Sequence, residues 1–394
     1  MTQLRIWWPF TLVSLVLIIG TLGTALASPL YPIYQAAWQL LPSHISFIFT
    51  SYMLGCLMTL LFFGRLSNSI GFLNTLKIGV ALIILGLVIC TYAPSAMTLG
   101  IGRFVIGIAS GLISTSALIG LSYTVPKNYH ALAPQFGSML AALGFGLGPV
   151  IGGGIAQYST QPLITPYLPI IMGCVACLML LFQLTAPKFE QQPFDFKARL
   201  QVPTKNHRFA FFILSWTAFS AFAVFSLFAS LAPSFLQQAL GWKGPLVSGL
   251  SIGSILFISV IVQFLTRTQA AQRSLAQGLL LMTMSLILLT ICMGFKINSL
   301  FIASVIVLGI GHGLSFIGSF SILNQLTHEK DRAAITSTYL FCGYLGAIFP
   351  ILAVGYLSDF LGLVIGIIIY ALCFSCLLFI LYYAQKHIKK YQNS

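Results

Sequence analysis

Charged residues are scarce in this sequence, and acidic residues are the scarcest of all. Only 6% of the 394 residues are Asp, Glu, Lys or Arg, and only five are acidic. A water-soluble domain carries about 25% charged residues, so this composition excludes an ordinary soluble protein. Hydrophobic residues make up 58% of the chain. Lipid is therefore the expected solvent for most of this protein.

The sequence also lacks the residue groupings on which catalysis and ATP hydrolysis depend. Neither the apolar segments nor the loops contain a Ser-His-Asp set, paired carboxylates or a cluster of metal ligands. No phosphate loop of the type GxxxxGK is present. We therefore expect no enzymatic activity, no cofactor and no metal.

Apolar runs fill the chain almost from end to end. A membrane-spanning helix needs about 20 apolar residues, and the sequence predicts twelve such helices, at residues 8–30, 43–63, 75–93, 96–121, 131–157, 163–186, 209–236, 246–265, 274–295, 299–324, 333–357 and 362–384. The longest polar stretch divides them six and six. We predict an all-α membrane protein with two six-helix bundles, residues 1–187 and 209–394, joined by a cytoplasmic linker at 188–208.

The positions of the basic residues predict how the chain crosses the membrane. The net charge of +14 does not indicate a nucleic-acid partner, because Lys and Arg are spread through the gaps between apolar runs. Cytoplasmic loops are enriched in basic residues. With the N-terminus inside, sixteen basic residues face the cytoplasm, two face outward and Arg103 lies within a helix. This orientation places both termini in the cytoplasm, on the inner face of a cytoplasmic membrane.

The two predicted bundles repeat each other. The segment from Leu99 to Arg103 reads LGIGR, and the segment from Leu308 to His312 reads LGIGH, in the corresponding helix of the second bundle. Proline repeats likewise, in the pairs Pro29 with Pro233 and Pro149 with Pro350. These pairs predict pseudo-symmetric bundles, an arrangement in which the solute site lies near the membrane midplane.

Three segments resemble the major facilitator superfamily, in particular its bacterial drug and solute antiporters. They are the loop after the second helix, Arg103 with its following glycines, and the glycine-rich fifth helix. The loop motif consists of Gly64, Arg65, Asn68, Gly71 and Lys77. The motif of the fifth helix consists of Gly144, Gly148, Pro149, Gly152 and Gly153. The resemblance implies a twelve-helix fold, alternating access, and efflux of a small molecule in exchange for protons. Asn68 stands where the family's loop usually has an acidic residue, which implies a weaker conformational latch.

Arg103 and His312 are the strongest individual candidates for the solute or proton pathway. An arginine inside a membrane helix costs about 2.5–3.5 kcal/mol on insertion scales, and it usually faces a cavity or a partner. The alternative is that Arg103 binds backbone carbonyls as an anchor. Histidine titrates near neutral pH, so His312 is the candidate proton carrier.

Further polar side chains lie on helices expected to line a cavity. Such groups orient a ligand, although in membrane helices they often bond their own backbone or a neighbouring helix instead. The candidates are Tyr34, Gln35, Tyr52, Ser114, Asn324 and Tyr344.

The four-residue spacing of Gly144, Gly148 and Gly152 predicts a smooth helix face for close packing. Pro149 removes one backbone hydrogen bond and allows the helix to kink. The combination suits a helix that slides during transport, although static packing explains the same pattern.

All five acidic residues are predicted to lie in loops: Glu190, Asp195, Glu329, Asp331 and Asp359. Export of organic cations usually needs a buried carboxylate, so we expect a neutral or anionic solute. The leading hypothesis is a proton-coupled exporter with the lipid bilayer, a small molecule and protons as partners, and no obligatory protein partner. A uniporter or importer of a small metabolite is the first alternative. A transporter-like receptor that moves no solute is the second.

Overall fold

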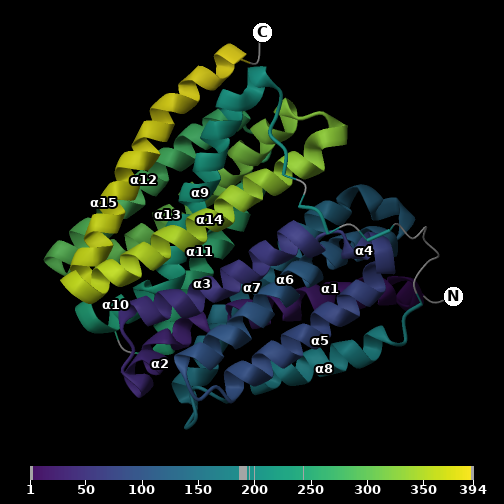
Figure 1. Ribbon diagram of the computed structural model, residues 1–394, viewed down its shortest axis with the longest axis horizontal. Coiled ribbons are helices and arrows are strands. Elements are labelled where there is room, and N and C mark those ends of the chain that lie inside the picture. The colour runs from purple at the N-terminus through teal and green to yellow at the C-terminus, as the bar shows by residue number, and fades with distance from the viewer. Residues whose placement is uncertain (1–2, 186–192, 195, 199, 243, 392–394) are drawn as a thin grey trace. The chain divides into compact units, whose positions relative to one another are not determined.

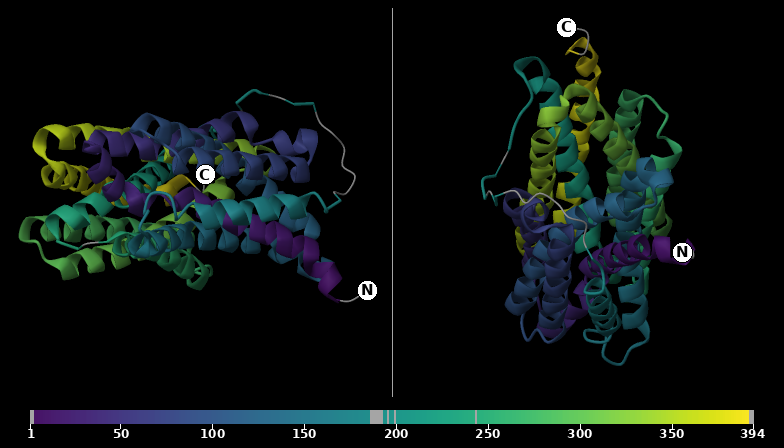
Figure 2. Two further views of the ribbon diagram at one scale, coloured as in Figure 1. Left: turned by 90° about the horizontal axis from the view of Figure 1, so that it is seen from below. Right: turned by 90° about the vertical axis from the view of Figure 1, so that its right-hand side faces the viewer.

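The computed structural model describes all residues except 1–2, 186–192, 195, 199, 243 and 392–394. Its described residues form helices and connecting segments without any strand (Figure 2). Helices satisfy every backbone polar group within one segment, which the hydrocarbon core of a membrane requires. Eleven helices of the described chain are long and apolar enough to span a membrane, and a shorter apolar helix covers Tyr167–Leu181. The predicted all-α, twelve-helix fold is confirmed.

The first compact unit contains Met1–Trp38 and Ser51–Ala198. Its helices, coloured purple to teal in Figure 1, pack through α1 onto α6, α7 and α8, and through α5 onto α6. They are α1 (Gln3–Ala25), α2 (Tyr31–Trp38), the later part of α3 (Pro42–Met58), α4 (Leu66–Ile70), α5 (Phe72–Thr91), α6 (Ala96–Thr124), α7 (Ala133–Tyr158) and α8 (Leu168–Leu181).

The second compact unit contains Gln39–Thr50, which includes the start of α3, and Arg199–Ser394. Here α13 packs onto α11 and α12, and α9 packs onto α14. The helices are α9 (Arg208–Ser230), α10 (Ala232–Ala239), α11 (Pro245–Leu265), α12 (Ala271–Phe295), α13 (Asn298–Leu326), α14 (Glu329–Leu361) and α15 (Leu363–Ala384). The bundle boundaries drawn from the sequence stay a prediction, and residues 188–192, 195 and 199 of the predicted linker lie outside the described residues.

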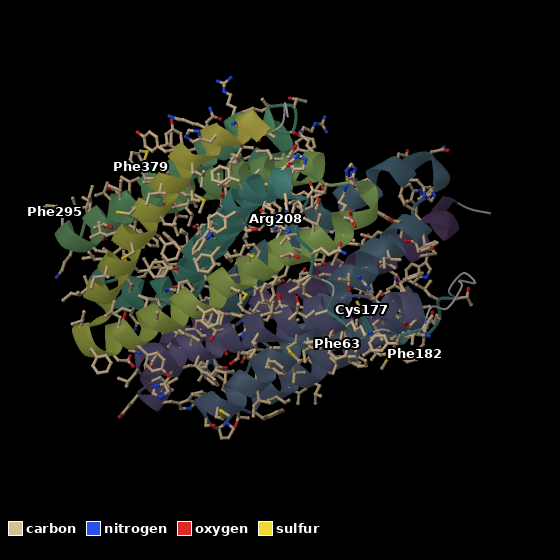
Figure 3. All side chains as sticks on the ribbon, turned by 45° about the horizontal axis from the view of Figure 1, so that its top comes forward. Phe63, Cys177, Phe182, Arg208, Phe295 and Phe379 are labelled. Carbon is tan, nitrogen blue, oxygen red and sulfur yellow. The ribbon has the colours of Figure 1, made fainter. Side chains whose placement is uncertain are left out.

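Large apolar side chains remain exposed on the outside of these helices. Phe295, the last residue of α12, is 73% exposed, and Phe379 of α15 is 46% exposed (Figure 3). In water such a surface would drive aggregation. It is the surface expected of helices that face lipid.

Two of the predicted helices are interrupted near their prolines. The span predicted at 8–30 contains the end of α1 at Ala25 and a 3₁₀ turn at Ser28–Leu30, and the span predicted at 209–236 contains the end of α9 at Ser230 and the start of α10. Pro29 and Pro233 each occupy one of the first two positions of the segment that follows. Proline is tolerated there because the first N–H groups of a helix have no intrahelical acceptor.

The sixth predicted helix is shorter than the sequence indicated. Residues Gln161 to Tyr167 form turns, with the Ile164 amide donating to Gln161 at 3.1 Å, and α8 begins only at Leu168. Pro162 and Pro166 explain the delay, because the residue before a proline avoids helical backbone angles.

The prediction that all acidic residues lie in loops was wrong for three of the five. Glu329 and Asp331 lie in the first turn of α14, where negative charge is favoured by the helix dipole, and Asp359 lies in its last turn. The Asp359 carboxylate accepts a hydrogen bond from the Ser43 backbone N–H at 3.0 Å, at the start of α3. Glu190 and Asp195 lie outside the described residues. The described helix interiors thus carry no carboxylate.

Two helix junctions share both sequence and backbone geometry. The segment Gly64–Gly71 reads GRLSNSIG and the segment Gly355–Gly362 reads GYLSDFLG. Gly71 has φ 85° and ψ 152°, and Gly362 has φ 86° and ψ 151°. This region of backbone space is essentially restricted to glycine. Each glycine ends one helix and directly precedes the next, α5 or α15.

Candidate functional site

Close backbone packing positions Arg103 in unit 1. A Cβ atom on Gly107 of α6 would lie 2.2 Å from the Tyr52 carbonyl oxygen of α3, and a Cβ on Gly55 would lie 2.2 Å from the Phe104 carbonyl oxygen. The two helices therefore touch at their backbones, which glycine alone permits. This contact brings Tyr52 beside Arg103, one turn away on α6.

The Arg103 side chain is buried, with 1% of its surface exposed. Its Nη1 donates a hydrogen bond to the Thr24 carbonyl oxygen of α1 at 2.5 Å, and the guanidinium carbon lies 4.8 Å from the centre of the Tyr52 ring. The carbonyl and the ring face both stabilise a positive charge. Arg103 thus has the backbone contact expected of an anchor together with a central, buried position.

Phenols and a thiol complete the surroundings of Arg103. Tyr31, Cys90 and Tyr167 lie close enough to interact electrostatically with the guanidinium. The Tyr34 and Tyr167 hydroxyls form a hydrogen bond at 3.0 Å, which joins α2 to the residue preceding α8. We call Arg103, Tyr31, Tyr34, Tyr52, Cys90 and Tyr167 the arginine cluster. Its members come from five separate segments of unit 1 and contain no carboxylate.

Two polar atoms of the arginine cluster make no hydrogen bond of good geometry within the described structure. They are Nε of Arg103 and the hydroxyl oxygen of Tyr31; both are buried, and the Tyr31 hydroxyl makes only loose contacts with Ser28 and the Arg103 side chain. A buried donor without an acceptor costs about 1–3 kcal/mol. A solute that presents a carbonyl or carboxylate oxygen would remove that cost. The cluster can therefore bind an acceptor-bearing solute.

His312 occupies the related place in unit 2. Arg103 contacts α1 and α3, the first two long helices of the chain. His312 contacts α9 and α11, the first two long helices of the second half. Its Nδ1 lies 3.0 Å from the Ser259 Oγ of α11, and its ring centre lies 5.9 Å from that of Phe225 on α9. Gln263 donates from Nε2 to the same Ser259 oxygen at 3.1 Å. The sequence repeat therefore corresponds to a repeat of environment.

The structure separates the remaining predicted residues into different surroundings. Tyr34 and Tyr52 belong to the arginine cluster, whereas Gln35 and Ser114 are half-buried residues outside the cluster. Asn324 lines a cavity in unit 2. Tyr344 packs edge-on against Phe222, with ring centres 5.5 Å apart.

The glycine face of α7 packs against α1. Cβ atoms on Gly144, Gly148 and Gly152 would lie 2.5, 2.5 and 2.6 Å from the carbonyl oxygens of Ile18 and Leu22 in α1 and of Leu26 just after it. Gly153 is buried beside them, and Pro149 lies inside the helix. The face therefore permits the close packing predicted from its spacing, and its role in movement stays a prediction.

The predicted loop signature surrounds the short helix α4. Gly64 follows a π-helical turn at Thr59–Phe63, and the Arg65 carbonyl accepts a hydrogen bond from the Asn68 amide at 2.9 Å. The Asn68 side chain is exposed. The Lys77 amino group lies 4.6 Å from the ring centre of Phe182, labelled in Figure 3, beyond the end of α8.

Sequence reasoning missed Tyr167, Ser259 and Gln263. Gln263 had a usable signal, since it is an amide inside the apolar run predicted at 246–265. No sequence signal distinguished Tyr167 and Ser259, because tyrosine and serine are frequent in this chain. Which of them face a candidate site depends on how each segment is rotated in the fold. In the described chain no group of three or more His, Cys, Asp or Glu side chains could hold a metal ion.

Comparisons with solved structures agree with this fold. A bacterial homolog of the human lysosomal transporter Spinster, solved in an inward-facing and occupied conformation, superposes with a TM-score of 0.74. The match covers 99% of this chain and 98% of that one at 12% sequence identity, so it bears on the fold alone.

Curated relatives resemble the chain at low identity. The riboflavin transporter RibZ of Clostridioides difficile is 24% identical over 186 residues, which are 47% of this chain and 41% of RibZ. The MFS-type transporter EfpA of Mycobacterium tuberculosis is 27% identical over 326 residues, 76% of this chain and 56% of EfpA. The putative multidrug resistance protein MdtD of Pectobacterium atrosepticum is 24% identical over 48% of this chain and 40% of its own. The chain spans about half the length of these relatives.

A family profile also matches most of the chain. The profile described as Major Facilitator Superfamily matches residues 13–350. That range includes all three segments on which the sequence resemblance was based, together with Arg103 and His312. This chain is an integral membrane protein that belongs to the Major Facilitator Superfamily.

Proposed function

We propose that this protein is a secondary transporter that exports a small neutral or anionic solute by alternating access, in exchange for protons. The arginine cluster carries the proposal, because it holds a buried guanidinium whose Nε has no well-aligned acceptor in the described structure, together with the Tyr31 hydroxyl, which makes only loose contacts with Ser28 and Arg103. A solute oxygen between these groups would accept hydrogen bonds from both. Relatives named as efflux and multidrug resistance proteins support export.

The experiment that tests this function begins with the purified protein. A ligand that binds the folded state raises its apparent thermal stability, so a panel of neutral and anionic compounds would be screened by thermal shift. Compounds that bind would then be followed across proteoliposome membranes with and without a pH gradient. Transport that is accelerated by the gradient supports proton-coupled exchange. Gradient-independent movement would favour the uniporter, and binding without movement would favour the receptor.

Organic cations are expected to be poor substrates. The arginine cluster has no carboxylate to offset the positive charge of a cation, and like charges in a low-dielectric site repel each other. Ethidium added to proteoliposomes should therefore be exported at a small fraction of the rate of a neutral or anionic ligand from the same screen. Robust ethidium export by the purified protein would contradict the proposed solute class.

His312 is the proposed proton carrier. Replacing it by Gln keeps a hydrogen-bonding side chain of similar size beside Ser259 but removes the titrating group. The His312→Gln protein should transport at a rate that varies less with pH than the wild-type rate does. The matched control is His44→Gln, because His44 lies in the first turn of α3, away from α13. A pH profile that survives His312→Gln would exclude His312.

We further propose that the protein resides in a cytoplasmic membrane with both termini in the cytoplasm. The excess of basic residues in alternate loops supports this orientation. The proposed bundles remain residues 1–187 and 209–394, joined by 188–208.

A further inference from the structure

A cavity of about 370 Å³ opens between α11 and α13 in unit 2. Side chains of both helices line it, among them Gln263, Phe316, Phe320, Ser321, Asn324 and Gln325. No lining residue is charged. Its volume lies near the lower end of the ~300–1,000 Å³ typical of small-molecule sites. A ring system of two or three fused rings matches that volume.

Two aromatic side chains in the cavity lining have parallel rings. The Phe316 and Phe320 rings are inclined by only 3°, with their centres 6.1 Å apart along α13. Their neighbours hold them in this orientation: the His312 ring is inclined by 13° to Phe316, and the Tyr339 ring packs edge-on against Phe320. The Tyr339 hydroxyl in turn forms a hydrogen bond with Ser319 Oγ at 2.7 Å. A planar ligand can therefore lie parallel to both rings and stack on the exposed face of the pair.

A hydrogen bond orients Gln263, one of the polar residues in the cavity lining. Gln263 uses its Nε2 to donate to Ser259, whose hydroxyl also contacts His312. The same amide also carries the acceptor Oε1 and a second Nε2–H that the bond to Ser259 does not use. Asn324, also in the lining, carries an amide with two N–H donors. The wall thus offers an acceptor from α11 and donors from α13.

We propose that this cavity binds a planar heteroaromatic ring whose edge carries an N–H group beside a carbonyl. The N–H donates to Gln263 Oε1, the carbonyl accepts from the Asn324 amide, and the ring face stacks on Phe316 and Phe320. The inference rests on the proposed transport function, since it assigns the cavity as a binding site for the transported solute. It adds a chemical class for that solute.

Fluorescence titration with two matched probes tests the assignment. Lumichrome is a planar three-ring heterocycle with edge N–H groups beside carbonyls, and 1,3-dimethyllumichrome is the same ring without an N–H donor. Wild-type protein should bind lumichrome with quenched fluorescence and bind the dimethyl compound about tenfold more weakly, the effect of one or two lost hydrogen bonds. Gln263→Met should weaken lumichrome binding about tenfold and abolish the discrimination between the probes.

Two further variants separate ring stacking from hydrogen bonding. Phe320→Leu removes one ring of the wall and should weaken both probes by a similar factor. Gln272→Met is the control, because Gln272 of α12 donates to the Gln385 carbonyl at 3.1 Å outside this cavity and should leave both affinities unchanged. Equal thermal midpoints across the variants would show that the fold is retained. Absence of lumichrome binding to wild type, or equal binding to wild type and Gln263→Met, would overturn the proposal.

A proteoliposome assay distinguishes failure of this subsite from failure of the transport function. Lumichrome binding with the expected variant pattern but without transport of any bound compound would retain the subsite and refute the transporter. Transport of another solute by protein that does not bind lumichrome would retain the transporter and refute the subsite.

Discussion

Arg103→Ala protein is expected to insert into membranes normally and to lose at least about tenfold of its transport rate at subsaturating solute. A hydrogen bond to a charged group contributes about 1.5–3 kcal/mol, and about 1.4 kcal/mol corresponds to a factor of ten. Arg103→Ala removes the guanidinium that we propose to contact the solute. The rate would be measured in proteoliposomes with a solute identified by thermal shift.

The Arg103→Lys variant makes this experiment more specific. Lysine keeps the positive charge but has no planar fork, so it cannot bind the Thr24 carbonyl and a solute oxygen with fixed geometry. We expect Arg103→Lys to retain less than about one-tenth of the wild-type rate as well. Arg267→Gln is the control, since Arg267 is an exposed arginine whose guanidinium carbon lies 4.9 Å from the centre of the Phe264 ring. Transport that persists in both Arg103 variants would assign Arg103 to anchoring alone.

Gly144→Val is expected to destabilise unit 1 strongly. A Cβ at this position would lie 1.9 Å from Thr21 Oγ1 and 2.5 Å from the Ile18 carbonyl oxygen. The threonine hydroxyl can rotate away, but the backbone oxygen of α1 can move only with its helix. Overpacking typically costs about 1–3 kcal/mol, and the additional methyl groups of valine place this substitution toward the upper end.

The measurement is the thermal midpoint of the purified protein, with yield of monodisperse material as a second readout. Gly294→Ala is the matched control, because no atom lies within 4 Å of a Cβ at that position near the end of α12. Its midpoint should equal or slightly exceed the wild-type value, since alanine favours helix more than glycine does. A Gly144→Val protein as stable as Gly294→Ala would contradict the close packing of α7 on α1.

The large-scale fold was predictable because membrane helices follow simple physical rules. Long apolar runs must form helices in lipid, and the first and seventh helices even carried paired prolines. Hydropathy could not show that each of these helices is interrupted, since the residues on both sides of Pro29 and Pro233 are equally apolar. The positions of Glu329, Asp331 and Asp359 were missed for a related reason: helix α14 extends beyond its apolar stretch at both ends.

The candidate site was only partly predictable. Arg103 was identifiable because a charge inside an apolar run is rare, and His312 because its surrounding sequence repeats that of Arg103. The partners of both residues depend on helix rotation and on contacts between distant segments. Tyr167 meets Tyr34 across 133 positions of sequence, and no local pattern encodes that pairing.

The matching junctions at Gly71 and Gly362 bear on the internal repeats of the chain. They follow the second and the eleventh membrane helices, which are not equivalent in a simple duplication of six helices. They are equivalent if each half is itself built from two three-helix repeats, because both are then the middle helix of a triplet. A glycine-only backbone conformation resists replacement by other residues. The two junctions thus occupy the same place in two such triplets, with the same glycine-only backbone geometry.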